Sequence, residues 1–127
     1  MKKTVHSEAA PAAVGPYSQA VRAGDFLFVS GQLGIDPATK RMAEGGIENQ
    51  AERALANIAA ILEAAGGDMR SVVKTTVLLQ SMDDFARLNQ VYARFFPSDP
   101  PARATYQVAQ LPLGALVEIE AIAYLGR

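Results

Sequence analysis

The chain has 127 residues, 50% of them hydrophobic and 20% charged, so it is long enough for one domain with its own core and too apolar for disorder. Its net charge of −1 gives no general attraction to nucleic acid or to an anionic membrane. The absence of cysteine excludes disulfides, thiol nucleophiles and Cys-based zinc sites, and the single histidine, His6, excludes a histidine-rich metal site.

No secretory signal is expected from the N-terminal residues. Met1-Lys2-Lys3 is followed by polar residues and not by the apolar segment of a signal peptide. No apolar run approaches the roughly 20 residues of a membrane span, so a cytoplasmic protein without membrane contacts is expected. Pro11 interrupts regular structure in residues 8–13, which predicts a coil packed over another part of the chain.

A strand hairpin is predicted next. Residues 15–21 form a turn that leads into a strand, and residues 26–33 form a second strand. The second strand starts with four apolar residues, which indicates cover on both of its faces. Gly31 interrupts it, and marks either a bulge or the close approach of a ligand or a neighbouring backbone. Tyr17 is ambiguous, but its residue type favours a packed ring with a satisfied hydroxyl.

An amphipathic helix follows a loop. Residues 34–46 form the loop, with room for a short strand near Met42. Apolar residues then recur at spacings of three and four, which is typical of a helix: Ile47, Ala51, Ala54, Leu55, Ile58, Ile61, Leu62 and Ala65. Gly66-Gly67 ends this helix, and residues 72–79 are rich enough in β-branched side chains for a central strand.

A second helix is predicted between Ser81, its expected N-cap, and Pro97. Its apolar residues are Phe85, Leu88, Tyr92, Phe95 and Phe96. Asn89 lies on the same stripe, and a buried amide must be hydrogen-bonded. Two interpretations are open: the amide pins a neighbouring loop, which is favoured, or it frames a site.

Two further strands end the chain and carry its candidate chemistry. Arg103, Thr105 and Gln107 share one strand face, and Glu118 and Glu120 share a face of the last strand. A guanidinium in an apolar strand needs a partner, because burying it alone is unfavourable. If the two strands are neighbours, the arginine can meet either glutamate.

Spacing alone favours an internal ion pair or solvated glutamates at this position. The alternative is a charged site, in which Arg103 holds an anionic substrate through paired hydrogen bonds and a glutamate handles a proton or a water molecule.

The whole pattern reads β-β-(β)-α-β-α-β-β, without an internal repeat, P-loop or Rossmann fingerprint. It predicts a single α+β domain over residues 1–127, with two helices on one face of a sheet. The other face needs cover, and self-association is the simplest source of it.

Seven segments together resemble one family over essentially the whole chain. They are Gly15–Ala20, Val29–Gln32, Val73–Val77, Asn89, Pro101–Arg103, Leu111-Pro112 and Val117–Ala121. In order and composition they are similar to those of the RidA (YjgF) proteins, the deaminases of reactive 2-imino acids. One difference is visible: many bacterial members have cysteine where this chain has Thr105.

The resemblance implies a chorismate-mutase-like fold of the bacillus type, with a mixed six-stranded sheet and a homotrimer with a barrel-like core and ligand clefts between subunits. It implies hydrolysis of 2-iminobutanoate and of 2-iminopropanoate derived from 2-aminoacrylate, giving 2-oxo acids and ammonia, with no cofactor and no metal. The alternatives in the family are a non-catalytic trimer that binds small carboxylates, a ribonuclease or translation inhibitor, and a chaperone-like protein. The charge gives no reason to expect a nucleic-acid partner.

The resemblance also implies three catalytic roles. Arg103 would clamp the substrate carboxylate, Glu118 would handle the attacking water, and the Ser30 hydroxyl would help to position that water.

The remaining matches concern binding of the substrate. The backbone N–H of Thr105 would contact the anion, and Tyr17, Gly31 and Asn89 would frame or support the pocket. Glu120 and Phe85 are two further candidates.

Overall fold

A computed structural model describes residues 1–126. This part of the chain contains six strands and two α-helices: β1 (Lys3–Val5), β2 (Ala20–Ala23), β3 (Phe26–Leu33), α1 (Ile47–Ala64), β4 (Val72–Leu79), α2 (Phe85–Phe95), β5 (Ala102–Gln107) and β6 (Val117–Tyr124). Short 3-10 turns precede β4, α2 and β6. Neither α1 nor any other helix within residues 1–126 combines the length and apolar character that a bilayer-spanning segment needs.

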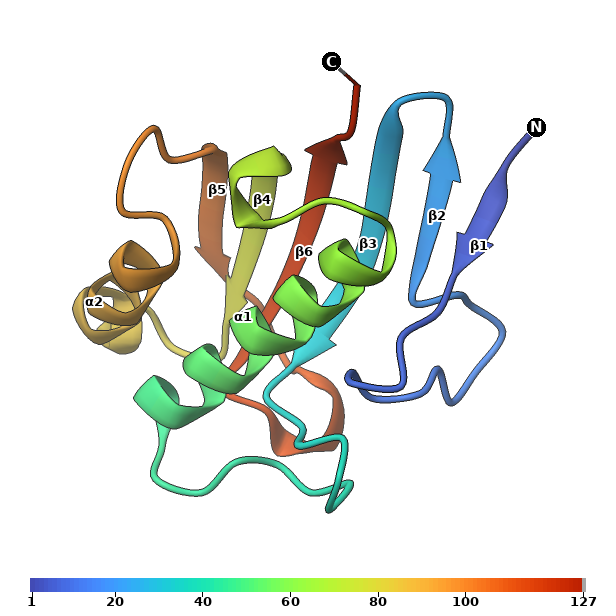
Figure 1. The fold of residues 1–127 in the computed structure, drawn as a ribbon. Helices are drawn as coiled ribbons and strands as arrows, with labels where there is room; N and C mark the ends of the chain where they lie inside the picture. Colours follow the sequence, from blue (N-terminus) through green and yellow to red (C-terminus); the bar gives the residue numbers. More distant parts are fainter. Residues whose placement is uncertain (127) are drawn as a thin grey trace.

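The strands form one mixed sheet in the order β1-β2-β3-β6-β4-β5 (Figure 1). Neighbouring strands are antiparallel except β4 and β5, which are parallel. A parallel pair needs a crossover connection, and α2 provides it. The predicted mixed sheet of six strands is therefore confirmed, although one of its strands is not the predicted one.

That difference lies at the N-terminal edge of the sheet. The strand Lys3–Val5 was not predicted, because three mostly exposed residues carry no hydrophobic alternation and are ordered by the ladder with β2. Met42, where a short strand was expected, makes only an isolated bridge with Ile35. The first predicted strand begins at Ala20, and residues 15–19 before it are turn and coil.

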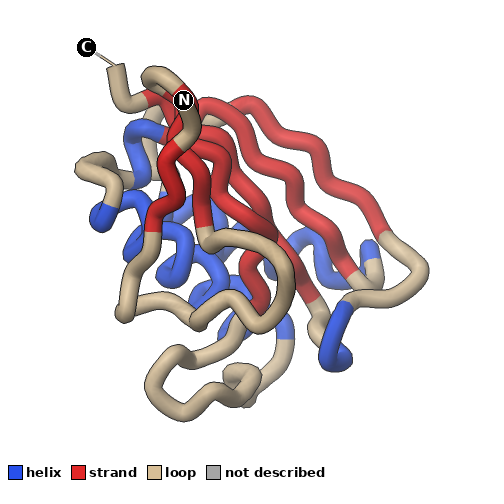
Figure 2. Tube along the Cα trace, turned by 90° about the vertical axis from the view of Figure 1, so that its right-hand side faces the viewer, coloured by secondary structure: helices blue, strands red, loops and turns tan. Residues whose placement is uncertain are grey.

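Both helices lie on one face of the sheet, as predicted, and Figure 2 shows this layer from the β1 edge. The buried side chains of β3, β4 and β6 meet the apolar stripe of α1, whose predicted members from Ile47 to Leu62 are buried. The opposite face, called the open face below, carries aromatic side chains that are 41% to 52% exposed: Phe26, Phe28, Tyr106 and Tyr124. The prediction that one sheet face lacks cover within the chain is confirmed.

The start of the loop after β3 is fixed to α1 by the fully buried Asn57. Its Nδ2 donates to the carbonyl oxygens of Leu33 (3.2 Å) and Ile35 (2.9 Å), and its Oδ1 accepts from Nε of Arg53 at 3.0 Å. Gly34 lies between these carbonyls, and a Cβ there would be 2.5 Å from the backbone oxygen of Gln50. The amide thus fixes the course of a loop that borders the groove described below.

We expect Asn57→Ala to lower the free energy of unfolding by about 2–4 kcal/mol, because two buried carbonyl oxygens lose their donor and a cavity remains. Urea denaturation at one fixed protein concentration measures the effect. Asn49→Ala is the matched control, since Nδ2 of Asn49 makes an exposed hydrogen bond to the Glu44 carbonyl (2.6 Å). Equal effects of the two substitutions would contradict this role of Asn57.

Candidate functional site

A groove of about 1000 Å³ lies where the N-terminal coil meets β3 and β6. Five of the predicted site residues line it: Tyr17, Ser30, Gly31, Glu118 and Glu120. The coil after β1, the loop after β3 and the turn at Pro112-Leu113 complete its walls. The structure thus brings one part of the predicted site together in a single chain.

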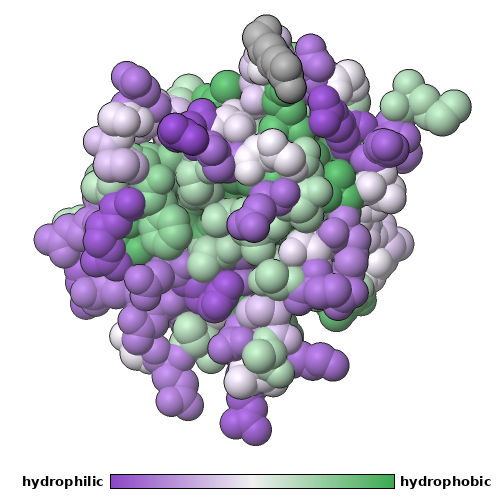
Figure 3. Space-filling model, in the orientation of Figure 1, coloured by the Kyte–Doolittle hydropathy of each residue, from purple (hydrophilic) through white to green (hydrophobic). Residues whose placement is uncertain are grey.

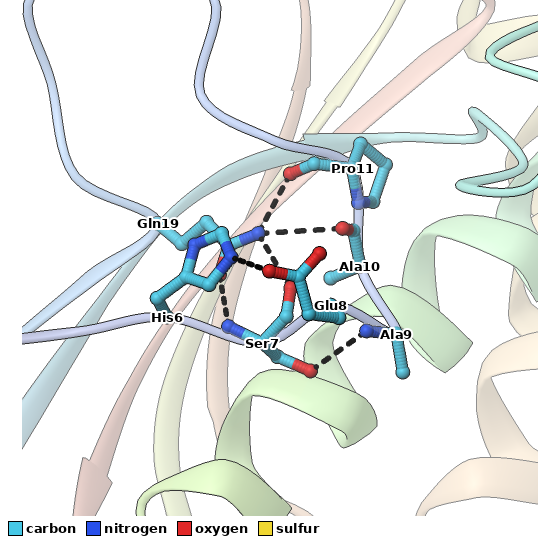
Figure 4. Close-up of polar contacts among 7 residues, drawn as sticks. All are labelled: His6, Ser7, Glu8, Ala9, Ala10, Pro11 and Gln19. Atoms are coloured by element: carbon cyan, nitrogen blue, oxygen red, sulfur yellow. Dashed lines mark hydrogen bonds and ion pairs between the residues drawn. The ribbon is translucent and has the colours of Figure 1, made fainter.

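The coil wall is held in place by the buried amide of Gln19, which was not predicted as a functional residue. Its Nε2 donates to the carbonyl oxygens of Pro11 (2.8 Å), Ser7 (3.1 Å) and Ala10 (3.4 Å), and its Oε1 accepts from the Ser7 N–H at 2.6 Å (Figure 4). The prediction that residues 8–13 are a coil packed over another part of the chain is confirmed. A glutamine next to a strand gives no sequence signal for this role.

Glu118 reaches the groove through a bulge in β3. The register between β3 and β6 shifts between Val29 and Gln32, so the bulge interpretation of Gly31 is confirmed. A Cβ on Gly31 would lie 2.8 Å from Cδ of Glu118 and would also collide with its Oε2. The missing side chain at Gly31 therefore leaves the space that the Glu118 carboxylate occupies.

Burial raises the pKa of the Glu118 carboxyl above its usual range, and the neighbouring charge of Glu120 adds to this effect. Both glutamates face the open side, because Glu118 pairs with Leu78 and Glu120 with Thr76, while the alternate residues of β4 are buried against the helices. Their shared face was predicted from strand periodicity and is confirmed. The site therefore holds one carboxylate that takes up protons more readily than an isolated glutamate.

Ser30 and Tyr17 both line the groove, Ser30 with a hydrogen-bonded hydroxyl and Tyr17 with a largely exposed ring. The Ser30 hydroxyl donates to the Ser18 carbonyl oxygen at 2.6 Å, so its oxygen is left to act as an acceptor. Tyr17 is 51% exposed. The interpretation of Tyr17 as a packed ring is wrong, because the coil that carries it runs along the rim of the groove.

The second part of the predicted site lies on the helix side of the sheet. Arg103 on β5 pairs in register with the buried Thr75 of β4 and therefore points towards α2. Its guanidinium carbon lies 4.7 Å from the ring centre of Tyr92 and 5.6 Å from that of Phe85. Within residues 1–126, no carboxylate comes within 4.0 Å of this guanidinium. The cation is held by aromatic rings and has no anionic partner among residues 1–126.

Two polar atoms near Arg103 are buried without a hydrogen-bond partner within residues 1–126. They are Oδ1 of Asn89, on the α2 stripe between Phe85 and Tyr92, and Oγ1 of Thr105, on the same face of β5 as Arg103. Within residues 1–126 no hydrogen bond joins the Asn89 amide to a loop, and its Oδ1 has no partner, so the interpretation of Asn89 as a loop pin is wrong. Buried polar atoms are nearly always paired, so two orphans beside a free cation indicate an incomplete site. Figure 3 shows apolar surface in this region between α1, α2 and β5.

The Arg103 and Glu118 groups lie on opposite faces of the sheet. The arginine strand does not neighbour the glutamate strand, because the crossover through α2 places β5 outside β4, and β4 separates it from β6. An internal ion pair between Arg103 and either glutamate is therefore excluded. The predicted site residues thus fall into two separate groups, called below the Arg103 half-site (Arg103, Thr105, Asn89 and Phe85) and the Glu118 half-site (Glu118, Ser30, Gly31 and Tyr17).

Fold and half-sites together define a two-layer α+β protein with a carboxylate-lined groove on one side and an unpaired arginine on the other. Comparison with known proteins shows which family this protein belongs to. The model of the family described as Endoribonuclease L-PSP matches residues 7–125. The chain belongs to this family, which includes the RidA proteins it resembles in sequence.

Individual relatives are similar over almost the whole chain. RidA from an Antarctic Psychrobacter species shares 51% of its residues over 96% of this chain and 98% of its own, with a TM-score of 0.93. A Thermotoga maritima protein superposes with a TM-score of 0.97 at 51% identity, covering 100% of both chains. A mouse relative, 50% identical over 99% of this chain and 93% of its own, is named 2-iminobutanoate/2-iminopropanoate deaminase.

Proposed function

We propose that the protein hydrolyses 2-iminobutanoate and 2-iminopropanoate to 2-oxobutanoate and pyruvate, with release of ammonia. The observation that carries this proposal is the unpaired Arg103 beside two orphaned polar atoms, which together fit a small carboxylate ligand. The names of the mouse and bovine relatives, 50% and 52% identical, support the same reaction.

The complete site would form between subunits of a homotrimer. Arg103 and Glu118 cannot meet within one chain, so the Arg103 half-site of one subunit would face the Glu118 half-site of the next. The aromatic side chains of the open face support association, because contiguous exposed apolar surface typically marks an interface.

In this arrangement Arg103 holds the substrate carboxylate in two hydrogen bonds, with the N–H of Thr105 as an additional donor. Glu118 accepts a hydrogen bond from a water molecule and directs its oxygen to the imine carbon, and Oγ of Ser30 can accept a hydrogen bond from the second O–H of this water. The water oxygen bonds to carbon, and the nitrogen takes up a proton. The carbinolamine then loses ammonia and leaves the 2-oxo acid. Every step is an addition, elimination or proton transfer, so the reaction needs no redox cofactor.

The direct test generates 2-iminobutanoate with an amino-acid oxidase and traps the remaining imine with semicarbazide. We expect the protein to reduce semicarbazone formation in proportion to its concentration. If the protein leaves the amount of semicarbazone unchanged but binds 2-oxobutanoate saturably, it is a carboxylate-binding protein and not a deaminase. The cytoplasmic location stays a prediction, which cell fractionation tests.

An RNA substrate, which the family description suggests, is not proposed for this chain. The groove is lined by the carboxylates of Glu8, Asp36, Glu118 and Glu120, against Lys40 and the single histidine. Negative charges at this density repel a phosphate backbone.

A pH prediction follows from the raised pKa of Glu118. Activity requires the ionised carboxylate, so kcat/KM falls as pH drops through this pKa. We expect Glu120→Gln to remove a neighbouring negative charge, lower the Glu118 pKa and move the acidic limb to lower pH. Rates are measured relative to uncatalysed hydrolysis at each pH. Glu63→Gln, on the exposed side of α1, is the control and should leave the limb in place. If the acidic limb of Glu120→Gln stayed in place or moved to higher pH, the charge of Glu120 would not contribute to the raised Glu118 pKa.

A further inference from the structure

We infer that Tyr92, held by Thr75, is a positioning residue that keeps the Arg103 guanidinium ready for a carboxylate. The inference rests on the proposed function for its biological meaning. Its structural basis is a continuous chain of contacts from β4 through α2 to β5. Neither Tyr92 nor Thr75 is part of the predicted site.

The Tyr92 ring is the nearer of the two rings over which the guanidinium lies, at 4.7 Å against 5.6 Å for Phe85. An arginine side chain has many rotamers, and ordering it upon ligand binding weakens binding. A ring beneath the guanidinium restricts these rotamers beforehand. The ring attracts the cation through its π face, and the N–H donors at the edge of the guanidinium remain free for a carboxylate.

Thr75 on β4 fixes the hydroxyl end of the Tyr92 ring. Its Oγ1 and the Tyr92 hydroxyl form a hydrogen bond of 2.7 Å, and the two residues are 1% and 6% exposed. Thr75 is also the in-register neighbour of Arg103 across the β4–β5 ladder. Phe96 packs against the other side, with ring centres 4.7 Å apart. Two contacts, with Thr75 and with Phe96, thereby fix the position of the Tyr92 ring.

The ring also stays uncharged. Burial raises the pKa of the Tyr92 hydroxyl, and this effect outweighs those of the Thr75 hydrogen bond and the Arg103 charge, which act in the opposite direction. A neutral ring holds the guanidinium without neutralising it. An acidic side chain in the same place would pair with Arg103 and compete with the substrate.

Two double variants separate the ring from the buried hydrogen bond. Tyr92→Phe with Thr75→Val removes both hydroxyls and keeps the ring, whereas Tyr92→Leu with Thr75→Val removes the ring as well. Calorimetry compares their binding of 2-oxobutanoate and of its neutral amide, 2-oxobutanamide. Because Phe96 still packs against the ring when both hydroxyls are removed, we expect the Phe/Val variant to bind 2-oxobutanoate within about twofold of wild type. The Leu/Val variant should bind it about tenfold more weakly. Amide binding should be the same in both.

The inference would be overturned if the Leu/Val variant lost affinity equally for 2-oxobutanoate and for its amide. It would also be overturned if this variant kept the wild-type affinity for 2-oxobutanoate. A measurement on the wild type avoids dependence on the folding of any variant. The Nε–H resonance of Arg103 should be shifted upfield by the ring currents, and a resonance at the random-coil position would also overturn the inference. Both readouts are independent of turnover. A protein that binds 2-oxobutanoate in this manner but leaves imine loss unchanged would refute the proposed deaminase and not the role of Tyr92.

Discussion

Arg103→Ala is expected to lower kcat/KM for 2-iminobutanoate by about 100-fold or more. Two charge-assisted hydrogen bonds to the substrate carboxylate would be lost, each worth about 1.5–3 kcal/mol, together with the alignment they impose. The loss should exceed that from any groove substitution other than at Glu118. The semicarbazide assay at equal protein concentrations measures it.

Stability provides the control for this prediction. The guanidinium has no carboxylate within 4.0 Å among residues 1–126, so Arg103→Ala breaks no ion pair and removes only its contacts with the Tyr92 and Phe85 rings. Such contacts are worth about 1 kcal/mol, so the melting temperature should fall by only a few degrees. Arg87→Ala, which removes an α2 arginine paired with Asp84 at 2.7 Å, is the matched substitution and should leave activity intact. Near-normal turnover by Arg103→Ala would show that another group binds the carboxylate.

Glu118→Gln should lower kcat by about 100-fold or more while changing KM little. The amide keeps the shape of the side chain but cannot take a proton from the attacking water, and positioned general bases contribute about 10²–10⁴ in rate. Steady-state kinetics at the pH optimum of the wild type measure the effect.

Glu120→Gln separates the two glutamates of β6. Glu120 is exposed, whereas the Glu118 carboxylate fills the space left by Gly31. We therefore expect Glu120→Gln to keep most of the activity at the optimum. The reverse pattern, with an active Glu118→Gln and an inactive Glu120→Gln, would assign the water to Glu120.

Local patterns predicted the parts of this fold that depend on neighbouring residues. The stripe from Ile47 to Leu62 defined α1 and its buried face, and period-two alternation placed Glu118 and Glu120 on one face of β6. Gly66, with a φ of 88°, ends α1 as expected of a residue that adopts the left-handed conformation without strain. Each of these features depends only on residues a few positions apart in the sequence, so composition and spacing suffice to predict it.

Features that depend on distant partners were not predictable in this way. Periodicity does not tell which strand lies next to which, so it gave no sign that β4 separates β5 from β6. It also could not distinguish two asparagines on two helices: the buried Asn57 donates to carbonyl groups after β3, whereas Oδ1 of the half-buried Asn89 has no partner within residues 1–126. Both differences affect the site, because they decide where Arg103 points and which amide remains free near it.

Complementation between two inactive variants tests most directly whether Arg103 and Glu118 of different subunits form one site. Arg103→Ala and Glu118→Gln chains are unfolded together at equal amounts and refolded, and mass spectrometry confirms mixed oligomers. Each site then has a chance of about one half for an intact Arg103 and about one half for an intact Glu118, so about a quarter of the wild-type activity should return. Variants mixed without refolding should stay inactive. Confirmed mixed oligomers without any recovered activity would contradict a site shared between subunits.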